Sequence, residues 1–211
     1  MDIVIAGAHG QIAMLLHPLL VANGHRVRGL IRNPAHAPAV EAAGAQPVIC
    51  DLETESDLSC AVGTADVVLF AAGAGPGSSA ERKMTMDRDG ALKLIDAAKR
   101  NRIARYVMIS AIHAEEPRGS EVFRVYLQAK SQADSALRAS GLDYTIVRPG
   151  RLTDEPATGR VSLSANLPQG HIPRADVAGV VAQVIPLASA IGHQFDLTAG
   201  KDPIASALKS L

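Results

Sequence analysis

Aromatic residues are scarce in this sequence of 211 residues. Tryptophan is absent, and phenylalanine and tyrosine together make up 3% of the chain. Because 47% of the residues are hydrophobic, the core must consist mainly of alanine, valine, leucine and isoleucine. Such a core is usual for a sheet covered by helices on both faces. The length favours one domain, residues 1–211.

Charge imbalance, cysteine and long apolar runs are lacking too. Lys plus Arg equals Asp plus Glu at 21 each, so the electrostatic signature of nucleic-acid or anionic-membrane binding is absent. Cys50 and Cys60 provide no disulfide framework and fit a reducing compartment. We expect no signal peptide after Met1-Asp2, and no run approaches the roughly 18 apolar residues of a membrane span. These absences predict a cytoplasmic protein that acts on a small-molecule substrate. The sequence does not indicate the oligomeric state.

The most informative stretch of the sequence is at its N-terminus. Apolar residues 3–5 predict a short buried strand, Gly7 and Gly10 a tight turn, and the residues from Gln11 onward an apolar helix. The two glycines allow a sharp turn and the close approach of a pyrophosphate, to which the helix offers unpaired N–H groups and partial positive charge. This order is typical of a nucleotide-binding βαβ unit, although the spacing is G-x-x-G-x-x-A and Ala13 stands at the close-packing position.

Strand and helix patterns alternate along the rest of the chain. We expect an α/β fold with a doubly wound, mostly parallel sheet and helices on both faces. The expected strands are 26–31, 47–50, 66–70, 105–109, 143–147 and 194–197, and the expected helices are 11–22, 35–43, 54–62, 79–100, 120–140 and 174–188. Residues 151–173 are irregular, with a possible strand at 159–163. This segment is expected to cover the substrate, and the alternative is a surface loop without a role.

The end of the second expected strand indicates which dinucleotide is bound. A carboxylate at this position would bind a ribose diol and favour NAD, but the chain has Arg32 followed by Asn33. A guanidinium offers planar, charge-assisted donors that suit a 2′-phosphate. The prediction is NADP(H) in preference to NAD(H), and the alternative is an ordinary solvated arginine.

Two further strand ends contribute candidate cofactor contacts. Asp51 could accept a hydrogen bond from the adenine amino group with Leu52 against the ring, or it could be a helix-capping or solvent-exposed aspartate. Ala71, Ala72 and Gly73 are small enough for the backbone to pass close under a dinucleotide.

Ser110, Tyr126 and Lys130 form the candidate catalytic group. The spacing of Tyr126 and Lys130 places both side chains on one face of a predicted helix. A nearby ammonium lowers the pKa of a tyrosine and makes it a usable proton donor to a developing alkoxide. Ser110, at the end of the preceding strand, could orient the same oxygen. The alternative is a surface tyrosine–lysine pair.

Several motifs together resemble a known family over nearly the whole chain. They are Gly7-Ala8-His9-Gly10-Gln11-Ile12-Ala13, Arg32-Asn33-Pro34, Cys50-Asp51-Leu52, Ala71-Ala72-Gly73, Asp89-Gly90, Tyr126 with Lys130, Gly141-Leu-Asp-Tyr-Thr-Ile-Val-Arg-Pro-Gly150 and Arg174-Ala-Asp-Val-Ala178. In these motifs the chain resembles the atypical short-chain dehydrogenases/reductases. Within them it is similar to the small NAD(P)H-binding proteins of the nitrogen-metabolite-repressor and flavin/biliverdin reductase type.

The resemblance implies a single-domain Rossmann fold and a nicotinamide cofactor, with Pro149 and Gly150 close to the nicotinamide. The chain departs from the group at His9, where threonine or serine is usual, and at Ala13, where glycine is usual. The group includes members that bind the cofactor without turning it over, so the resemblance supports binding more firmly than catalysis.

The resulting hypothesis is an NADP(H)-dependent oxidoreductase that transfers hydride to a small carbonyl, quinone or flavin-like acceptor. Tyr126 would donate the proton, Lys130 would tune it and hold ribose hydroxyls, and Ser110 would orient the acceptor. Two alternatives remain, a non-catalytic NADP(H) sensor that acts through a partner protein and a nicotinamide-assisted epimerase. The seven histidines show no metal-ligand spacing, and we expect His113 and His171 to be exposed loop residues.

Overall fold

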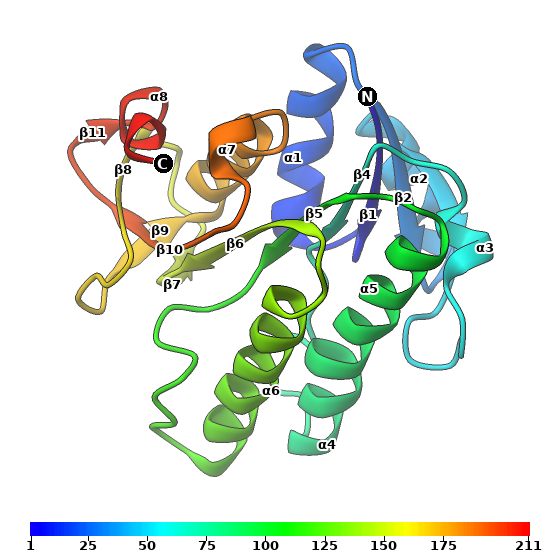
Figure 1. Cartoon of the computed structure of the whole chain (residues 1–211), viewed down its shortest axis with the longest axis horizontal. Coiled ribbons are helices and arrows are strands. Elements are labelled where there is room, and N and C mark those ends of the chain that lie inside the picture. The colour runs from blue at the N-terminus through cyan, green and yellow to red at the C-terminus, as the bar shows by residue number, and fades with distance from the viewer.

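The computed structural model describes residues 1–211 and has one nine-stranded sheet between two layers of helices (Figure 1). The strands, in their order across the sheet, are β11 (Asp202–Pro203), β8 (Arg160–Ser164), β10 (His193–Ala199), β6 (Asp143–Pro149), β5 (Arg105–Ile109), β4 (Val67–Phe70), β1 (Asp2–Ala6), β2 (Arg26–Ile31) and β3 (Gln46–Ile49). The strands from β10 to β3 are parallel, and β8 is antiparallel to its neighbours β10 and β11. The direction of the crossovers reverses at β1, between β4 and β2, which is where open α/β sheets bind ligands.

Alternate residues of the central strands enter two separate hydrophobic cores. In β1, Ile3 and Ile5 belong to the cluster beneath α1 (Gln11–Ala22) and α7 (Arg174–Val184). Val4 and Ala6 belong to the opposite cluster, which includes residues of α5 (Gly90–Arg100) and α6 (Glu121–Arg138). Burial on both faces explains why these strands read as continuous apolar runs.

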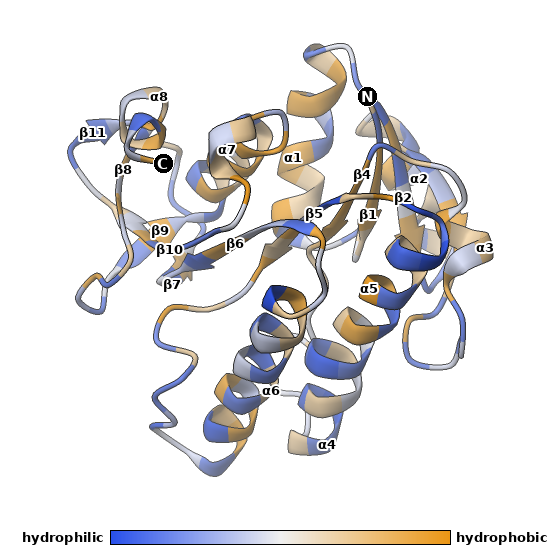
Figure 2. Cartoon of the chain, viewed as in Figure 1, coloured by the Kyte–Doolittle hydropathy of each residue, from blue (hydrophilic) through white to orange (hydrophobic).

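The remaining helical segments are short. They are α2 (Ala37–Ala42), α3 (Ser59–Val62), α4 (Ala80–Arg82) and α8 (Ile204–Ala207), with single turns at Pro34–His36, Ala188–Ala190 and Leu208–Ser210. A two-stranded parallel pair, β7 (Arg151–Thr153) and β9 (His171–Pro173), lies beside the main sheet. Hydropathy colouring shows polar outer faces on α5 and α6 and a largely apolar α1 (Figure 2). None of the helices combines the length and the apolar character that crossing a membrane requires.

The predicted fold class is confirmed, whereas four local predictions need correction. The helix expected at 174–188 ends at Val184. The helix expected at 54–62 begins only at Ser59, because Asp57 accepts hydrogen bonds from the N–H and hydroxyl of Ser59. The helix expected at 79–100 contains a π-helical stretch, Lys83–Asp89, between α4 and α5. Residues 151–173 are not irregular throughout, since they contribute β7, β8 and β9.

Candidate functional site

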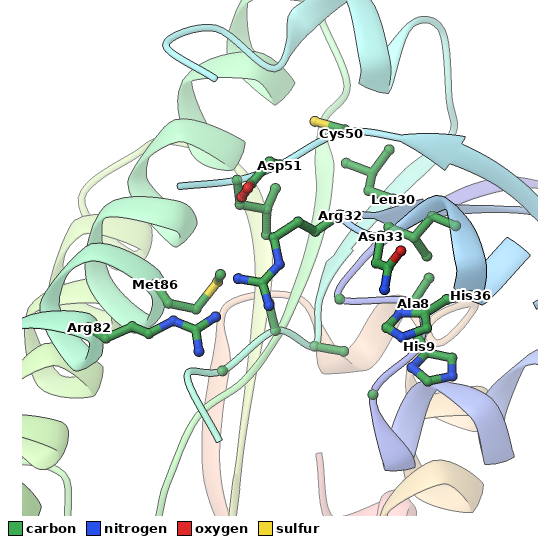
Figure 3. Close-up of a pocket in the computed structure, with 17 residues that line it drawn as sticks. Ala8, His9, Leu30, Arg32, Asn33, His36, Cys50, Asp51, Arg82 and Met86 are labelled. Carbon is green, nitrogen blue, oxygen red and sulfur yellow. The ribbon is translucent and has the colours of Figure 1, made fainter. Parts of the chain in front are cut away.

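A cleft crosses the carboxyl ends of β1, β2 and β4 and receives most of the predicted cofactor residues (Figure 3). Its lining residues are Gly7, Ala8, His9, Gly10, Leu30, Ile31, Arg32, Asn33, His36, Cys50, Asp51, Leu52, Ala71, Ala72, Gly73, Arg82 and Met86. Of the predicted set, Gln11 is exposed at the start of α1, and Ile12 points into the core. The structure also places Pro149, Gly150 and Lys130 outside this cleft.

The glycine turn forms the floor of the cleft. Gly7 has a φ of +82°, and a Cβ there would lie 2.6 Å from the Cα of Ala72. The turn is closed by the N–H of Gly10, which donates to the carbonyl of Gly7 at 2.9 Å. No side chain caps the helix that follows, and its first turn carries no acidic residue. The floor therefore fits a phosphate, because helix N–H groups lie open to it and no carboxylate of this turn opposes it.

Two arginines face each other across the cleft and share one carboxylate. Arg32 extends from the end of β2 and Arg82 from the end of α4 (Figure 3). Arg32 contacts Glu53 at 3.1 Å and Arg82 contacts it at 3.0 Å, and Thr85 donates to the same carboxylate at 2.9 Å. Although burial opposes it, these donors hold the pKa of Glu53 below its usual range. The cluster has two cations to one anion, and both guanidinium groups remain accessible to solvent.

Asp51 shapes a turn and also lines the cleft. One of its oxygens, Oδ1, accepts the backbone N–H of Glu53 at 2.9 Å, which shapes the turn after β3. The residue also lines the cleft beside Leu52 and Met86. A capping role therefore does not remove it from the position where an adenine would lie.

Lys130 is buried beneath the loop that follows β4. Its ammonium forms an ion pair with Asp87 at 3.2 Å and donates to the carbonyl of Ile109 at 3.3 Å. Asp87 lies in the π-helical stretch and also accepts the N–H of Ala74 at 3.1 Å. Burial opposes the charge on Lys130, but Asp87 and other neighbours raise its pKa above the usual value. Since an ammonium has three donors, one remains for a further partner such as a ribose hydroxyl.

Tyr126 is half-buried between two ammonium groups. The Nζ atom of Lys83 lies 5.4 Å from the centre of its ring, and that of Lys130 lies 6.0 Å from it. Lys130 acts to lower the pKa of Tyr126 as expected, but the net shift of that pKa is upward. Burial raises that pKa more than the ammonium lowers it, so the phenol remains protonated at neutral pH. The hydroxyl makes no hydrogen bond within the protein and is free to donate its proton.

Ser110 follows β5 and lies against a buried charged group. Its Oγ is buried and makes no close hydrogen bond, but it lies near enough to the Asp134 carboxyl to help lower the pKa of that group. Nearby, Arg148 bonds to Asp134 at 2.9 Å and also contacts Glu115. Burial raises the pKa of Asp134, and Arg148 opposes that rise. An unpartnered buried hydroxyl is costly, which makes Ser110 a candidate contact for a bound acceptor.

His113 is partly buried, so the expectation of an exposed residue is wrong for it, whereas His171 is exposed as expected. With a φ of +53°, His113 turns back from β5 and donates from Nε2 to the carbonyl of Leu167 at 2.7 Å. Its Nδ1 then accepts a hydrogen bond from Arg118 at 3.0 Å. These contacts hold the segment before β9 over the end of β6.

The covering segment packs directly on one of the predicted cofactor glycines. A Cβ on Gly150 would lie 2.5 Å from the carbonyl oxygen of Gly170. In addition, the N–H of Arg151 donates to that same oxygen at 2.9 Å. Pro149 and Gly150 thus lie between the sheet edge and residues 151–173, consistent with a covered acceptor site.

Sequence reasoning missed several residues of the site. Arg82 and Glu53 form an ion pair beside the cleft but belong to no recognisable motif, and nothing in their local sequence signals a shared role. The sequence around Asp87 resembles that of an ordinary polar position on a helix, so its burial and its pairing with Lys130 could not be predicted. His36, four residues after Arg32, lines the cleft as well. Its position near Arg32, the arginine expected to bind a 2′-phosphate, is the one feature of the sequence that could have indicated this.

Comparison with known proteins agrees with this geometry. Residues 7–186 match the model of a family described as NAD(P)H-binding. The chain is 39% identical to the uncharacterized sugar epimerase YhfK of Bacillus subtilis, with all of both chains covered.

Two solved structures are similar in fold and sequence. A protein of Bacillus halodurans, named as a candidate NAD-dependent epimerase/dehydratase, superposes with a TM-score of 0.95 at 37% identity, with all of both chains covered. ChuY, an anaerobilin reductase of Escherichia coli O157:H7, superposes with a TM-score of 0.78 at 26% identity, covering 94% of this chain and 97% of its own.

Proposed function

This chain belongs to the NAD(P)H-binding family, among the atypical short-chain dehydrogenases/reductases, and we propose that it is an NADP(H)-dependent reductase. The observation that carries the proposal is the pair Arg32 and Arg82, whose accessible guanidinium groups face each other across the cleft. A 2′-phosphate between them would receive charge-assisted hydrogen bonds from both sides. The carboxylates nearby, Glu53 and Asp51, would favour the ribose diol of NAD(H), so the two cofactors must be compared directly.

The residues at the other end of the site fit proton delivery to an acceptor. A bound NADPH supplies the hydride. The Tyr126 hydroxyl donates its proton to the acceptor oxygen as that oxygen gains charge, and solvent then restores the proton. Lys130, held by Asp87, places a positive charge beside Tyr126 that stabilises the phenolate left behind. Ser110 offers a hydroxyl without a partner to orient the same oxygen.

The cofactor assignment is tested by titrating NADPH and NADH into the wild type and into Arg32→Ala and Arg82→Ala. Loss of one charge-assisted contact is expected to weaken NADPH binding about tenfold to a hundredfold and to leave NADH binding within about threefold. Arg100→Ala is the matched control, because Arg100 is an exposed arginine paired with Asp57 outside the cleft. Equal affinity of the wild type for both cofactors, or an Arg32→Ala variant that keeps the preference, would contradict the assignment.

Turnover distinguishes the reductase from the two other functions. The protein is incubated with NADPH and a panel of aldehydes, quinones and flavins while the absorbance of the reduced nicotinamide is followed. Net oxidation supports the reductase, and tight binding without turnover on any acceptor supports a sensor. The names of the Bacillus relatives favour a nicotinamide-assisted epimerase as second candidate, which would isomerise a sugar nucleotide without net oxidation.

A further inference from the structure

Two histidines stack against each other at the rim of the cofactor cleft. The ring centres of His9 and His36 lie 3.7 Å apart, and the ring planes differ by 13°. His9 belongs to the turn between Gly7 and Gly10, while His36 ends the single helical turn that follows Arg32 and Asn33 (Figure 3). The pair therefore bridges the pyrophosphate turn and the segment expected to meet a 2′-phosphate.

Both imidazoles keep unused hydrogen-bonding capacity. Neither ring donates or accepts a hydrogen bond within the protein, and no carboxylate pairs with either of them. The ionisable side chains that line the same cleft are Arg32 after β2, Asp51 after β3 and Arg82 at the end of α4, and Glu53 pairs with both arginines. Glu53 is occupied by the two arginines, and Asp51 by the turn it forms.

Without an anion, protonation of His9 is unfavourable. Burial lowers the pKa of His9, and the neighbouring His36 lowers it further. When one of two stacked rings is protonated, its positive charge repels a second proton on the other ring. The pair therefore favours at most one positive charge. A phosphate dianion at the rim reverses this balance because an opposite charge favours the imidazolium.

We propose that the stacked His9–His36 pair is a proton-linked subsite for the 2′-phosphate of NADP(H), in which one imidazole takes up a proton as the phosphate binds. The inference rests on the proposed use of NADP(H) and adds to it a residue pair that sets cofactor specificity. It also gives His9 a role within the glycine turn. The second imidazole stays neutral and stacked, which positions the charged one toward the cleft.

The proposal fixes the sign of the pH dependence. The bound complex holds a proton more tightly than the free protein, so the contribution of the histidine to binding is lost as pH rises through the pKa of the liganded histidine. A phosphate monoester itself has a second pKa of about 6, and protonation of the ligand weakens binding at lower pH. Measurements at pH 7 and above isolate the contribution of the protein, where we expect NADPH affinity to fall about five- to tenfold between pH 7 and 8.5.

The direct test is calorimetry of NADP⁺ and NAD⁺ binding at pH 7.5 in HEPES and in Tris, whose ionisation enthalpies differ. For the wild type we expect uptake of roughly half a proton to one proton per NADP⁺ and none for NAD⁺. His9→Asn combined with His36→Gln should abolish the uptake and flatten the pH dependence of NADP⁺ binding. Both residues lie at the surface, so the double variant is expected to fold, and each single variant is measured beside it.

His193→Gln, an exposed histidine at the start of β10, is the matched control and should behave as the wild type. Absence of uptake with NADP⁺, equal uptake with NAD⁺, or uptake that persists in the double variant would each overturn the subsite. Equal uptake with both dinucleotides would assign the pair to the pyrophosphate instead. If NADP⁺ does not bind the wild type at all, it is the proposed function that fails, which distinguishes that outcome from a failure of the histidine pair.

Discussion

The two ends of the site are built from opposite kinds of side chain. At the adenosine end, Arg32 and His9 are exposed and Arg82 is accessible, so the groups that would meet a ligand already face solvent. At the reaction end, Ser110 and Lys130 are 4% exposed, and the charge of Lys130 is balanced by the buried Asp87. The first end can recognise an anion without rearrangement, whereas the second keeps its charges in fixed pairs.

This contrast shows where stability and function are coupled. An exposed ion pair adds about 0–1 kcal/mol, so the arginines can serve the ligand at little cost to the fold. A buried pair cannot lose one partner without leaving an uncompensated charge. We therefore expect variants at the adenosine end to change binding alone and variants at the reaction end to change folding as well.

The largest expected effect is that of Lys130→Met on stability. It leaves Asp87 buried and unpaired, and the free energy of unfolding is expected to fall by about 3–5 kcal/mol in urea denaturation. The double variant Asp87→Asn with Lys130→Met should recover most of this loss without recovering activity. Arg32→Ala, the counterpart at the adenosine end, should change stability by less than about 0.5 kcal/mol. Equal losses for Lys130→Met and Arg32→Ala would remove the distinction between the two ends.

Tyr126→Phe is expected to separate catalysis from stability within the reaction end. The hydroxyl has no hydrogen bond in the protein, so its removal should leave the unfolding free energy within about 0.5 kcal/mol. The value of kcat should fall about a hundredfold or more while NADPH binding is unchanged, because the proton donor is lost. Tyr144→Phe, at a half-buried tyrosine of β6, is the control for the substitution itself.

The pH dependence of the rate tests the assignment of Tyr126 as the proton donor. Burial raises the pKa of Tyr126, so the protonated, active form is present throughout the neutral range and is lost only as pH rises through that pKa. The wild-type rate with saturating NADPH should therefore stay level from pH 7 to 9. A rate that increases over this interval would indicate that a base, and not the Tyr126 hydroxyl, limits turnover.

The sequence predicted the adenosine end better than the reaction end for a physical reason. α1, β2 and β5 have the bounds expected from apolar periodicity and from the residues that flank them. Because parallel strands end at one edge of the sheet, residues just after β1, β2, β3 and β4 had to converge, and Gly7, Arg32, Asp51 and Ala71 do line one cleft.

Contacts between elements distant in sequence could not be predicted in this way. The pairing of Lys130 with Asp87 depends on a π-helical stretch, and the polar sequence of residues 83–89 carries no sign that its hydrogen bonds shift by one residue. The sharing of Glu53 by Arg32 and Arg82 likewise follows from how α4 packs against the turn after β3. Left-handed backbone at His113 is a similar case, since a glycine or asparagine would have signalled it and a histidine does not.

The smallest expected effects have opposite signs at the two ends. Asp196 is buried beneath the covering segment, accepts the N–H of Leu167 at 3.1 Å with one oxygen, and has no partner for the other. Burial raises its pKa above the unfolded value, so its contribution to stability is complete below the unfolded pKa and is lost as pH rises through the folded one. At the adenosine end, the donors around Glu53 lower its pKa, so its contribution is present at neutral pH and is lost as pH falls.

Asp196→Asn should therefore stabilise the protein at pH 7, and Glu53→Gln should destabilise it, each by about 1 kcal/mol or less. Asparagine keeps an acceptor for the N–H of Leu167 while removing the buried charge, and glutamine keeps the size of Glu53 while removing its attraction to the two arginines. Urea denaturation at pH 7 and at pH 4 gives the comparison, and both differences should shrink at the lower pH as the wild-type carboxyls become protonated. If Asp196→Asn were the less stable protein at pH 7, the charge of Asp196 would be compensated by Arg148 and His113, and the reaction end would be better balanced than its unpartnered oxygen indicates.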